Sequence, residues 1–486
     1  MNLVSVIPEL IVLLSAIVVI LCDAFFQAKR GLIFICLIGL VVAAGCSIAA
    51  WGGIPGATFY NMLVVDKFAI FFQLLFLAIA ALIILASADY VSKFAQFQGE
   101  YYALILLSTV GMMLMAAATE FISLFISLEL TSISLYAMAG FLKNQKSTEA
   151  SLKYFLLGAI SSAILLYGMA FIFGFTGKTQ LGEISLSLQM LSNNGFTTHS
   201  GLLLGIVLLV AGFGFKIAAF PFQMWVPDVY EGAPTPVTAY LSVASKAAGF
   251  AIIMRTFYTA FSLPAWLSQD WAMIFSILAA IGMTVGNIIA IPQLNIKRML
   301  GYSSIAQAGY IMVGLATMGL ATNVSLIGQS SLMFFLLGYT VTNLGAFIAI
   351  IAISNKVGSD QIDDYAGMIK RSPLVALALS LCMISLTGIP PTAGFMAKFY
   401  IFGAAVQHNL LWLVIIAVLN SVVSAYYYLR VIKVMWFNEP KIEGAVPSSG
   451  ALRVALLLSC AGVIVIGIIP DYAMKLAEAA AKMFAF

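Results

Sequence analysis

Charged residues are scarce in this sequence. Only 9% of its 486 residues are Asp, Glu, Lys or Arg, and 63% are hydrophobic, whereas about a quarter of the residues in a soluble globular domain are charged. The scarcity of charge excludes an ordinary soluble fold. The apolar runs are continuous and about 20 residues long, which is the length that a membrane-crossing helix needs, so they predict a polytopic α-helical membrane protein.

Histidine and cysteine are also rare. The sequence has two histidines and five cysteines, with no CxxC pair. Haem and iron–sulfur centres need His, Met or clustered Cys ligands within reach of one another, and cysteines in apolar runs usually pack as small hydrophobic side chains. The sequence therefore predicts no metal site, no redox centre and no cofactor bound by this chain.

Fourteen apolar runs are candidate transmembrane spans. They cover residues 3–22, 31–51, 68–88, 101–118, 120–141, 152–175, 201–221, 235–258, 271–291, 299–319, 329–353, 374–406, 410–430 and 452–470. The longest gaps between them, 176–200, 354–373 and 431–451, are too short for a separate soluble domain. GFGFK near the end of the seventh run lacks the spacing of a phosphate-binding loop, so we expect one membrane domain without a nucleotide site.

Two of these runs contain helix breakers. The twelfth run is too long for one simple span and carries Pro390 and Pro391 within TGIPPTAG, and the seventh ends at Pro221. Proline removes a helical donor, and unwound backbone persists at membrane depth only where protein or water lines it. The pattern predicts interrupted helices at both places, with a plain kink as the alternative.

Basic residues predict the orientation, because short cytoplasmic loops carry the excess of Lys and Arg. Loops and helix edges after odd-numbered spans hold fourteen basic residues: Lys29, Arg30, Lys93, Lys143, Lys146, Lys297, Arg298, Lys356, Lys370, Arg371, Arg430, Lys433, Lys441 and Arg453. The other side holds five: Lys67, Lys178, Arg255, Lys475 and Lys482. We therefore expect both termini on the non-cytoplasmic side.

Three lysines remain without a loop or an interface to explain them. With Lys153 placed near the cytoplasmic end of its span, the residues left deep in the apolar runs are Lys216, Lys246 and Lys398. The same sorting of the acids leaves Glu129, whereas Glu9 and Glu120 lie near enough to span ends for water to reach them. An intramembrane charge costs about 2.5 to 3.5 kcal/mol on insertion scales, so these four residues are candidate functional groups.

These residue types suit a proton relay. Burial lowers the pKa of a lysine from about 10.4 and a nearby carboxylate raises it, so a lysine between these two effects can exchange a proton near neutral pH. Other readings stay open: a structural ion pair for Glu129 with Lys216, snorkelling for Lys246, and water access through the break for Lys398.

Three further charged residues, Lys153, Asp228 and Glu231, are candidate accessory groups. Asp228 and Glu231 lie in the loop after the seventh span, and Lys153 lies near the start of the sixth. A solvated or loop-packing role is the alternative for each of them.

Several segments resemble the antiporter-like membrane subunits of respiratory complex I, the NADH:quinone oxidoreductase. The main one is PFQMWVPDVYEGAPTPVTAYLSVASKAAGF, and its form is most similar to the N-type subunits of the bacterial complex. The others are ATEFISLFISLEL, STEASLKYFLLGAISSA, QLNIKRMLGYSSIAQAGY and LTGIPPTAGFMAKF. Together these segments cover roughly residues 100 to 400.

The resemblance implies a fold of fourteen helices with two inverted five-helix repeats, helices 4–8 and 9–13, in which helices 7 and 12 are discontinuous. The chain would then divide into three N-terminal helices (1–100), a first repeat (101–258), a second repeat (271–434) and a C-terminal helix with a short tail (435–486). Interrupted helices where repeats meet are a recurrent device of transporters.

The resemblance also implies roles for the buried charges. Glu129 and Lys216 match the paired acid and lysine of the family, Lys246 the central lysine and Lys398 the lysine of the exit half. The family commonly has histidine at the second position after the proline of the seventh helix. Here Gln223 stands at that position, which argues against a proton-carrying role there.

The implied function is proton translocation in the membrane arm of a bacterial NADH:quinone oxidoreductase in the cytoplasmic membrane. NADH, flavin, iron–sulfur clusters and quinone would be handled by other subunits. The implied partners are other membrane-arm subunits and the lipid bilayer, with no nucleic acid. Two alternatives stay open, which are a subunit of a multisubunit Na⁺/H⁺ antiporter and a structural spacer of the membrane arm.

Overall fold

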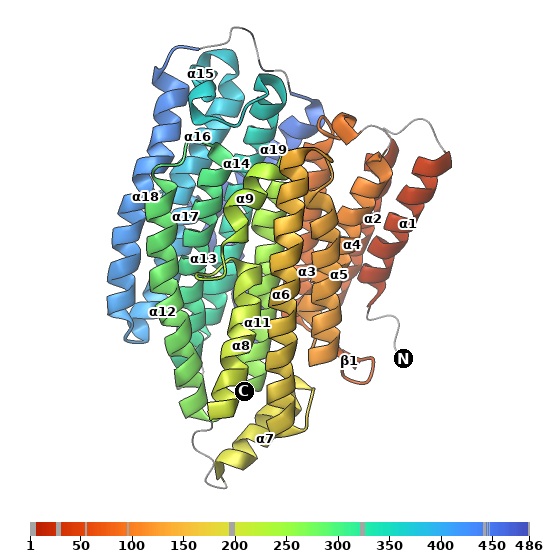
Figure 1. Ribbon diagram of the computed structural model, residues 1–486, viewed down its shortest axis with the longest axis vertical. Helices are drawn as coiled ribbons and strands as arrows, with labels where there is room; N and C mark the ends of the chain where they lie inside the picture. The colour runs from red at the N-terminus through yellow and green to blue at the C-terminus, as the bar shows by residue number, and fades with distance from the viewer. Residues whose placement is uncertain are drawn as a thin grey trace.

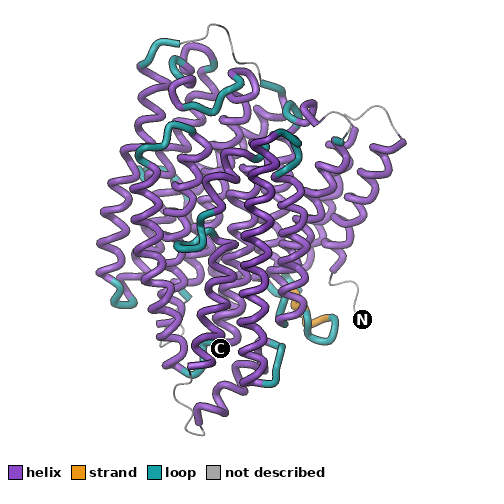
Figure 2. The backbone as a smooth tube through the Cα atoms, viewed as in Figure 1, coloured by secondary structure: helices purple, strands orange, loops and turns teal. Residues whose placement is uncertain are grey.

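The computed structural model describes residues 6–25, 31–53, 56–94, 97–193, 200–320, 326–440, 444, 446 and 448–484. Within these ranges the chain is a bundle of helices that run mostly along one common direction, with the N-terminal helices on one side and the later helices on the other (Figure 1). A short antiparallel hairpin, β1 (Gly56–Thr58) with β2 (Leu63–Val65), lies at one end of the bundle (Figure 2). The predicted all-α polytopic fold is confirmed.

The first half of the chain forms helices up to the region of the central lysine. They are α1 (Ile7–Phe25), α2 (Gly31–Ala50), α3 (Lys67–Ser87), η2 (Val91–Phe94), α4 (Gln98–Ala117), α5 (Phe121–Ala139), α6 (Gln145–Thr176), α7 (Leu181–Asn193), α8 (Ser200–Ile217), α9 (Trp225–Gly232), α10 (Thr235–Tyr240), η3 (Leu241–Ser245) and α11 (Lys246–Ala260). Helix α7 and the β1–β2 hairpin fall in segments for which the sequence predicted only loops.

The second half continues the bundle. Its helices are α12 (Ala265–Ala290), α13 (Ile296–Leu320), α14 (Ile327–Val357), η4 (Ile362–Tyr365), α15 (Met368–Arg371), α16 (Pro373–Thr387), α17 (Ala393–Gln407), α18 (Leu411–Phe437), α19 (Gly450–Ile468), α20 (Pro470–Ala481) and η5 (Lys482–Phe484). Helix α20 occupies what the sequence predicted to be only a short tail.

Among the described residues, 13 helical stretches are long and apolar enough to cross a membrane. Each of them overlaps one of the predicted spans, and the remaining predicted span is divided between α16 and α17. The chain is therefore a multi-pass membrane protein. The count of fourteen spans and the two inverted repeats stay predictions.

Helix α15, which carries Lys370 and Arg371, lies at the end of the bundle opposite the β1–β2 hairpin (Figure 1). The side of the membrane on which the termini lie stays a prediction. Three residues of that expectation, Lys29, Arg30 and Lys441, lie outside the described residues.

The seventh predicted span is interrupted, as expected. Helix α8 ends at Ile217, and Ala218 has a φ of 60°, a left-handed conformation that is costly for a residue other than glycine. Pro221 follows without an amide proton to continue the helix, and helix α9 begins only at Trp225. The last turn of α8 therefore ends inside the protein, with Lys216 in it.

The twelfth predicted span is interrupted between α16 and α17, which confirms the second expected break. Gly388 caps α16 with a φ of 90°, which glycine adopts without a Cβ clash. A Cβ at Gly394 would lie 1.8 Å from the carbonyl oxygen of Ser385, so only glycine lets α17 start this close to α16. In the unwound segment between them Thr392 is buried and Gly388 partly buried, whereas Ile389, Pro390 and Pro391 are exposed in this chain.

A third irregularity was not predicted. Residues Leu241–Ser245 form a single π-helical turn directly before Lys246. Such turns insert one extra residue into an α-helix and are frequent at functional sites. The sequence has no proline or glycine within this turn, so the breaker-based prediction could not find it.

The core of the bundle lies around three stretches. Between 89 and 94% of the apolar window is buried in residues 235–260, α13 and α14, against 33% in α1 and α2. In this chain the central stretches therefore contact mainly protein, whereas α1 and α2 present apolar side chains on the outside. Lys246 belongs to the central group.

The structure corrects the expectation that water reaches Glu9 and Glu120. Both side chains are only 4% exposed. Glu9 accepts a hydrogen bond from Gln73 Nε2 (2.6 Å), and Glu120 accepts one from Thr179 Oγ1 (2.9 Å). Packing of neighbouring segments covers these span ends, which distance along the sequence alone does not show.

Arg255 is a second correction, because the sequence assigned it to a loop edge. The side chain is 2% exposed and pairs with Asp66 through both guanidinium nitrogens, at 2.9 and 3.0 Å. Its Nε also donates to the carbonyl of Ala116 at 2.7 Å, and Asp66 caps α3 by accepting from the amide of Ala69. Arg255 therefore ties α11 to the start of α3 and the end of α4.

We expect Arg255→Ala to destabilise the chain by about 3 to 5 kcal/mol, because it leaves the buried Asp66 carboxylate without its partner. Thermal unfolding of the purified protein in detergent measures this effect. Lys67→Ala is the matched control, since Lys67 is exposed beside Asp66 at the start of α3. Equal unfolding temperatures of the Arg255→Ala variant and the wild type would contradict this account.

Candidate functional site

Glu129 and Lys216 lie on α5 and α8, and the structure does not join them directly. Lys216 Nζ donates to Ser132 Oγ at 2.6 Å and to Tyr136 OH at 3.3 Å. Glu129 Oε1 accepts from Ser162 Oγ at 2.5 Å. Among the described residues, the two form no ion pair within 4.0 Å. The expected counter-ion contact is therefore absent in this structure, although both groups belong to one polar region.

Hydroxyl groups of α5 and α6 build that region. Ser132 lies one turn from Glu129 on α5, and its hydroxyl donates to the carbonyl of Leu128 while it accepts from Lys216. On α6, Ser161 donates to the carbonyl of Gly212 on α8 at 3.0 Å. Helix α6 thus contacts α5 and α8 through adjacent serines, and the charged groups are lined by neutral hydroxyls.

Lys246 occupies the centre of the bundle. It is 2% exposed, and its Nζ donates to Ser304 Oγ at 2.5 Å and to the Ser304 carbonyl. The π-helical turn before Lys246 places this side chain at α13, on which Ser304 lies. The ring of Tyr339 from α14 lies 5.6 Å from the ammonium. Snorkelling to an interface is excluded for this conformation, because the ammonium is fixed inside the core.

Lys398 lies at the second helix break. Its Nζ donates to the carbonyls of Leu386 (3.3 Å) and Thr387 (2.9 Å), which are the last residues of α16. The carboxyl end of a helix carries partial negative charge, so the break offers the ammonium a neutral but electronegative site. A Cβ at Gly388 would lie 3.0 Å from Lys398 Cδ, which is a second reason for glycine there.

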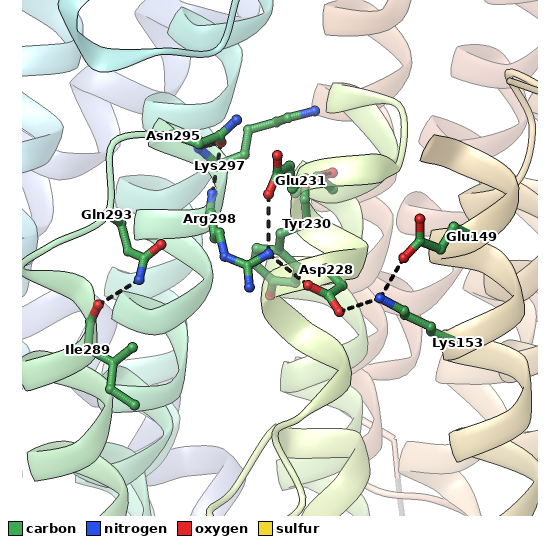
Figure 3. Close-up of polar contacts among 11 residues, drawn as sticks. Glu149, Lys153, Asp228, Tyr230, Glu231, Ile289, Gln293, Asn295, Lys297 and Arg298 are labelled. Atoms are coloured by element: carbon green, nitrogen blue, oxygen red, sulfur yellow. Dashed lines mark hydrogen bonds and ion pairs between the residues drawn. The ribbon is translucent and has the colours of Figure 1, made fainter. Parts of the chain in front are cut away.

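Lys153, Asp228 and Glu231 are brought together near the start of α6, in a charged cluster that Figure 3 shows with Glu149 and Arg298. Lys153 Nζ lies 2.7 Å from Glu149 and 2.8 Å from Asp228. Arg298 Nη1 lies 2.7 Å from Asp228 and 3.2 Å from Glu231. Asp228 on α9 therefore bridges Lys153 on α6 to Arg298 on α13.

Electrostatics fix the charge state of this bridge. Burial by itself raises the pKa of the Asp228 carboxyl, but the hydrogen bonds from Lys153 and Arg298 outweigh it, so the pKa lies below its ordinary value. Asp228 is consequently ionised at neutral pH. Four residues of the cluster, Glu149, Asp228, Glu231 and Arg298, line a cavity of about 230 Å³ together with Lys146.

Sequence reasoning missed three groups at this site. Ser304 was one of many hydroxyls in the spans, Tyr339 was one of many aromatic residues, and Arg298 was counted only as a loop cation. No local pattern marks them. Ser304 lies 58 residues from Lys246, Arg298 lies 70 residues from Asp228, and Tyr339 lies 35 residues from Ser304.

The Asp228 cluster predicts a pH dependence. A lowered pKa in the folded state gives a stabilisation that is fully present above the unfolded-state value of about 3.9 and is lost as the pH falls through the folded-state value. The side chains are about a third exposed, so the effect is about 1 kcal/mol or less.

We therefore expect Asp228→Asn to lower the unfolding temperature at pH 7 and to flatten its decline below about pH 4. Thermal unfolding across pH measures both effects. Asp363→Asn, at an exposed carboxylate, serves as the control and should leave the profile unchanged. A wild-type decline that Asp228→Asn does not alter would show that the bridge contributes nothing.

Comparisons with known proteins agree with this architecture. Residues 118–424 match the family model described as NADH:quinone oxidoreductase/Mrp antiporter, TM. A curated relative from Dehalococcoides mccartyi, named NADH-quinone oxidoreductase subunit N, is 50% identical over 478 residues, which is 98% of each chain.

Two solved structures share the fold. A chain of respiratory complex I from Thermus thermophilus aligns with a TM-score of 0.81 and 30% identity, covering 96% of this chain and 99% of that one. A chain of the Mrp complex from Dietzia sp. DQ12-45-1b aligns with a TM-score of 0.85 at 19% identity, covering 100% and 98%. At that identity the Mrp likeness concerns the fold alone. The chain belongs to the NADH:quinone oxidoreductase/Mrp antiporter transmembrane family and, within it, to the subunit N group.

Proposed function

We propose that this chain is the proton-translocating N subunit in the membrane arm of a bacterial NADH:quinone oxidoreductase. The observation that carries the proposal is the set of three lysines buried among neutral oxygens, two of which lie at helix breaks. The 50% identical relative named subunit N supports the assignment to this complex. Electron transfer from NADH to quinone takes place in other subunits, which hold the flavin and the iron–sulfur clusters.

Membership in this complex determines the partners of the chain and the membrane in which it lies. Other membrane-arm subunits, both antiporter-like and small, contact this chain, and lipid covers its remaining apolar surface. The chain lies in the bacterial cytoplasmic membrane, with both termini on the non-cytoplasmic side. The excess of basic residues in the loops after odd-numbered spans supports this orientation.

In this role Glu129 and Lys216 receive the coupling signal. Desolvation favours a neutral amine, and a nearby carboxylate favours the charged form. The structure holds the two groups on separate hydroxyl partners, so a shift of α5 or α8 that changes their separation changes whether Lys216 keeps its proton. The proton then passes to Lys246 in the core and to Lys398 at the second break.

The buried contacts argue against a purely structural role for the lysines. A buried cation that only joins helices is best neutralised by a carboxylate, as Arg255 is by Asp66. Lys216, Lys246 and Lys398 instead lie against hydroxyl and carbonyl oxygens. Such partners hold an ammonium and a neutral amine alike, as a site that exchanges protons requires.

We expect Lys216→Ala and Lys246→Ala complexes to pump markedly fewer protons per NADH oxidised than wild type, because each change removes a group that carries the proton. Proton uptake and NADH oxidation are measured together in inverted membrane vesicles. Lys356→Ala, at an exposed lysine, is the control and should pump normally. Wild-type stoichiometry in both buried-lysine variants would refute the relay.

A Na⁺/H⁺ antiporter subunit is the second candidate, because the matched family model is described as NADH:quinone oxidoreductase/Mrp antiporter, TM. Purification of the native complex under gentle conditions separates the two. Flavin and iron–sulfur proteins bound to this chain support the oxidoreductase, whereas copurification with small membrane subunits alone supports the antiporter. A spacer role predicts that charge-removing variants disturb assembly and leave pumping by the assembled complex intact.

A further inference from the structure

Three side chains from different helices converge on one hydroxyl, that of Ser304 on α13. Lys246 Nζ lies 2.5 Å from Ser304 Oγ. The hydroxyls of Tyr230 on α9 and Tyr339 on α14 each lie 3.2 Å from the same atom. All four side chains are 4% exposed or less. Among the described residues, Ser304 Oγ is the only side-chain atom that hydrogen-bonds to Lys246.

The Tyr339 branch continues toward Lys398. Tyr339, Gln307 and Lys398 line a small cavity of about 10 Å³ between α13, α14 and the second helix break. This is roughly the space that one water molecule needs, and a buried water needs two to four polar partners. Thr342 and Ser385 also line the cavity, so enough polar groups surround it to hold one water.

Gln307 keeps this cavity at the helix break. Its Nε2 donates to the carbonyl of Leu386 at 3.2 Å, and Lys398 Nζ donates to the same oxygen at 3.3 Å. The amide of Gln307 and the ammonium of Lys398 are thus held on one acceptor beside the cavity. Tyr339 and Lys398 both border the space that such a water would occupy.

We propose that Ser304 and Tyr339 carry the proton from Lys246 to Lys398, with one water in this cavity as the last link. The inference rests on the proposed function, since it names the route between two of its lysines. A hydroxyl both donates and accepts a hydrogen bond, so it can receive a proton on one side while it releases its own on the other.

The transfer leaves each hydroxyl neutral. In the structure Tyr339 OH donates to Ser304 Oγ, so both hydroxyls first rotate until Ser304 donates to Tyr339. The ammonium of Lys246 then gives a proton to Ser304 Oγ, and the former Ser304 proton moves to Tyr339. The former phenol proton moves to the water, and a proton of the water moves to the neutral amine of Lys398. Lys246 loses one proton, Lys398 gains one, and rotation of the two hydroxyls restores their starting hydrogen bonds.

Two tyrosines at equal distance from Ser304 offer a matched test. Tyr339→Phe removes the hydroxyl on the route, and Tyr230→Phe removes one that does not line the cavity, while both variants keep the ring. Protons pumped per NADH are measured in inverted vesicles that contain the assembled complex. We expect Tyr339→Phe to lower this ratio severalfold and Tyr230→Phe to keep it near the wild-type value.

Serine variants test the junction itself. Ser304→Ala should lower the ratio as Tyr339→Phe does, and Ser304→Thr, which retains a hydroxyl, should restore most of it. Ser303→Ala is the control, because Ser303 is equally buried but hydrogen-bonds to Tyr428. A packing defect would affect Ser304→Thr at least as strongly as Ser304→Ala, because threonine adds a methyl group.

The outcomes separate this inference from the proposed function. Normal pumping by Lys246→Ala overturns the function and the route together. Loss of pumping in Lys246→Ala with wild-type ratios in Ser304→Ala and Tyr339→Phe overturns the route alone. Equal losses in Tyr230→Phe and Tyr339→Phe overturn the assignment of Tyr339 as the exit branch.

Discussion

The cost of holding an ammonium inside a bilayer constrains this structure more than any other single factor. Lys216, Lys246 and Lys398 are each 9% exposed or less, and an unsolvated charge needs polar partners that an intact helix does not offer, because its own backbone groups are already paired. In this chain each lysine lies at or beside a place where helical geometry is interrupted. The interruptions and the charges therefore depend on each other.

The three interruptions give the lysine ammonium groups their polar partners in different ways. At the end of α16 the free carbonyls of Leu386 and Thr387 receive Lys398 directly. The break after α8 ends the helix one residue beyond Lys216, whose ammonium is received by hydroxyls of α5. The helix continues through the π-helical turn before Lys246, but the turn shifts the helical register of the residues that follow. In this register Lys246 donates a hydrogen bond to Ser304 on α13.

Much of this arrangement could be predicted from residue types. Long apolar runs defined the helices, Pro221, Pro390 and Pro391 marked two interruptions, and a count of cations against loops singled out the three lysines. The π-helical turn had no such mark, since it depends on packing between distant helices. Burial of Arg255 and Glu9 was missed for the same reason, because position along a span does not show which neighbour covers its end.

The partners were the least predictable part of the site. Opposite charge suggested that Lys216 would contact Glu129, yet the structure places serines against both groups. The residue types in the sequence do not show whether a buried lysine contacts a carboxylate or a hydroxyl. Both groups accept a hydrogen bond from an ammonium, and the chain is rich in serine. The choice has a consequence for function.

The chain buries cations in two distinct ways. Arg255 and Lys297 lie against the carboxylates of Asp66 and Asp360, and removal of a proton or a partner from such a pair leaves an uncompensated charge in the protein. The three lysines lie against neutral oxygens, so release of a proton leaves no stranded carboxylate behind. The first arrangement suits a permanent link between helices. Only the second lets charge enter and leave the core of the bundle without a change in its packing, which is the condition that a path for protons must meet.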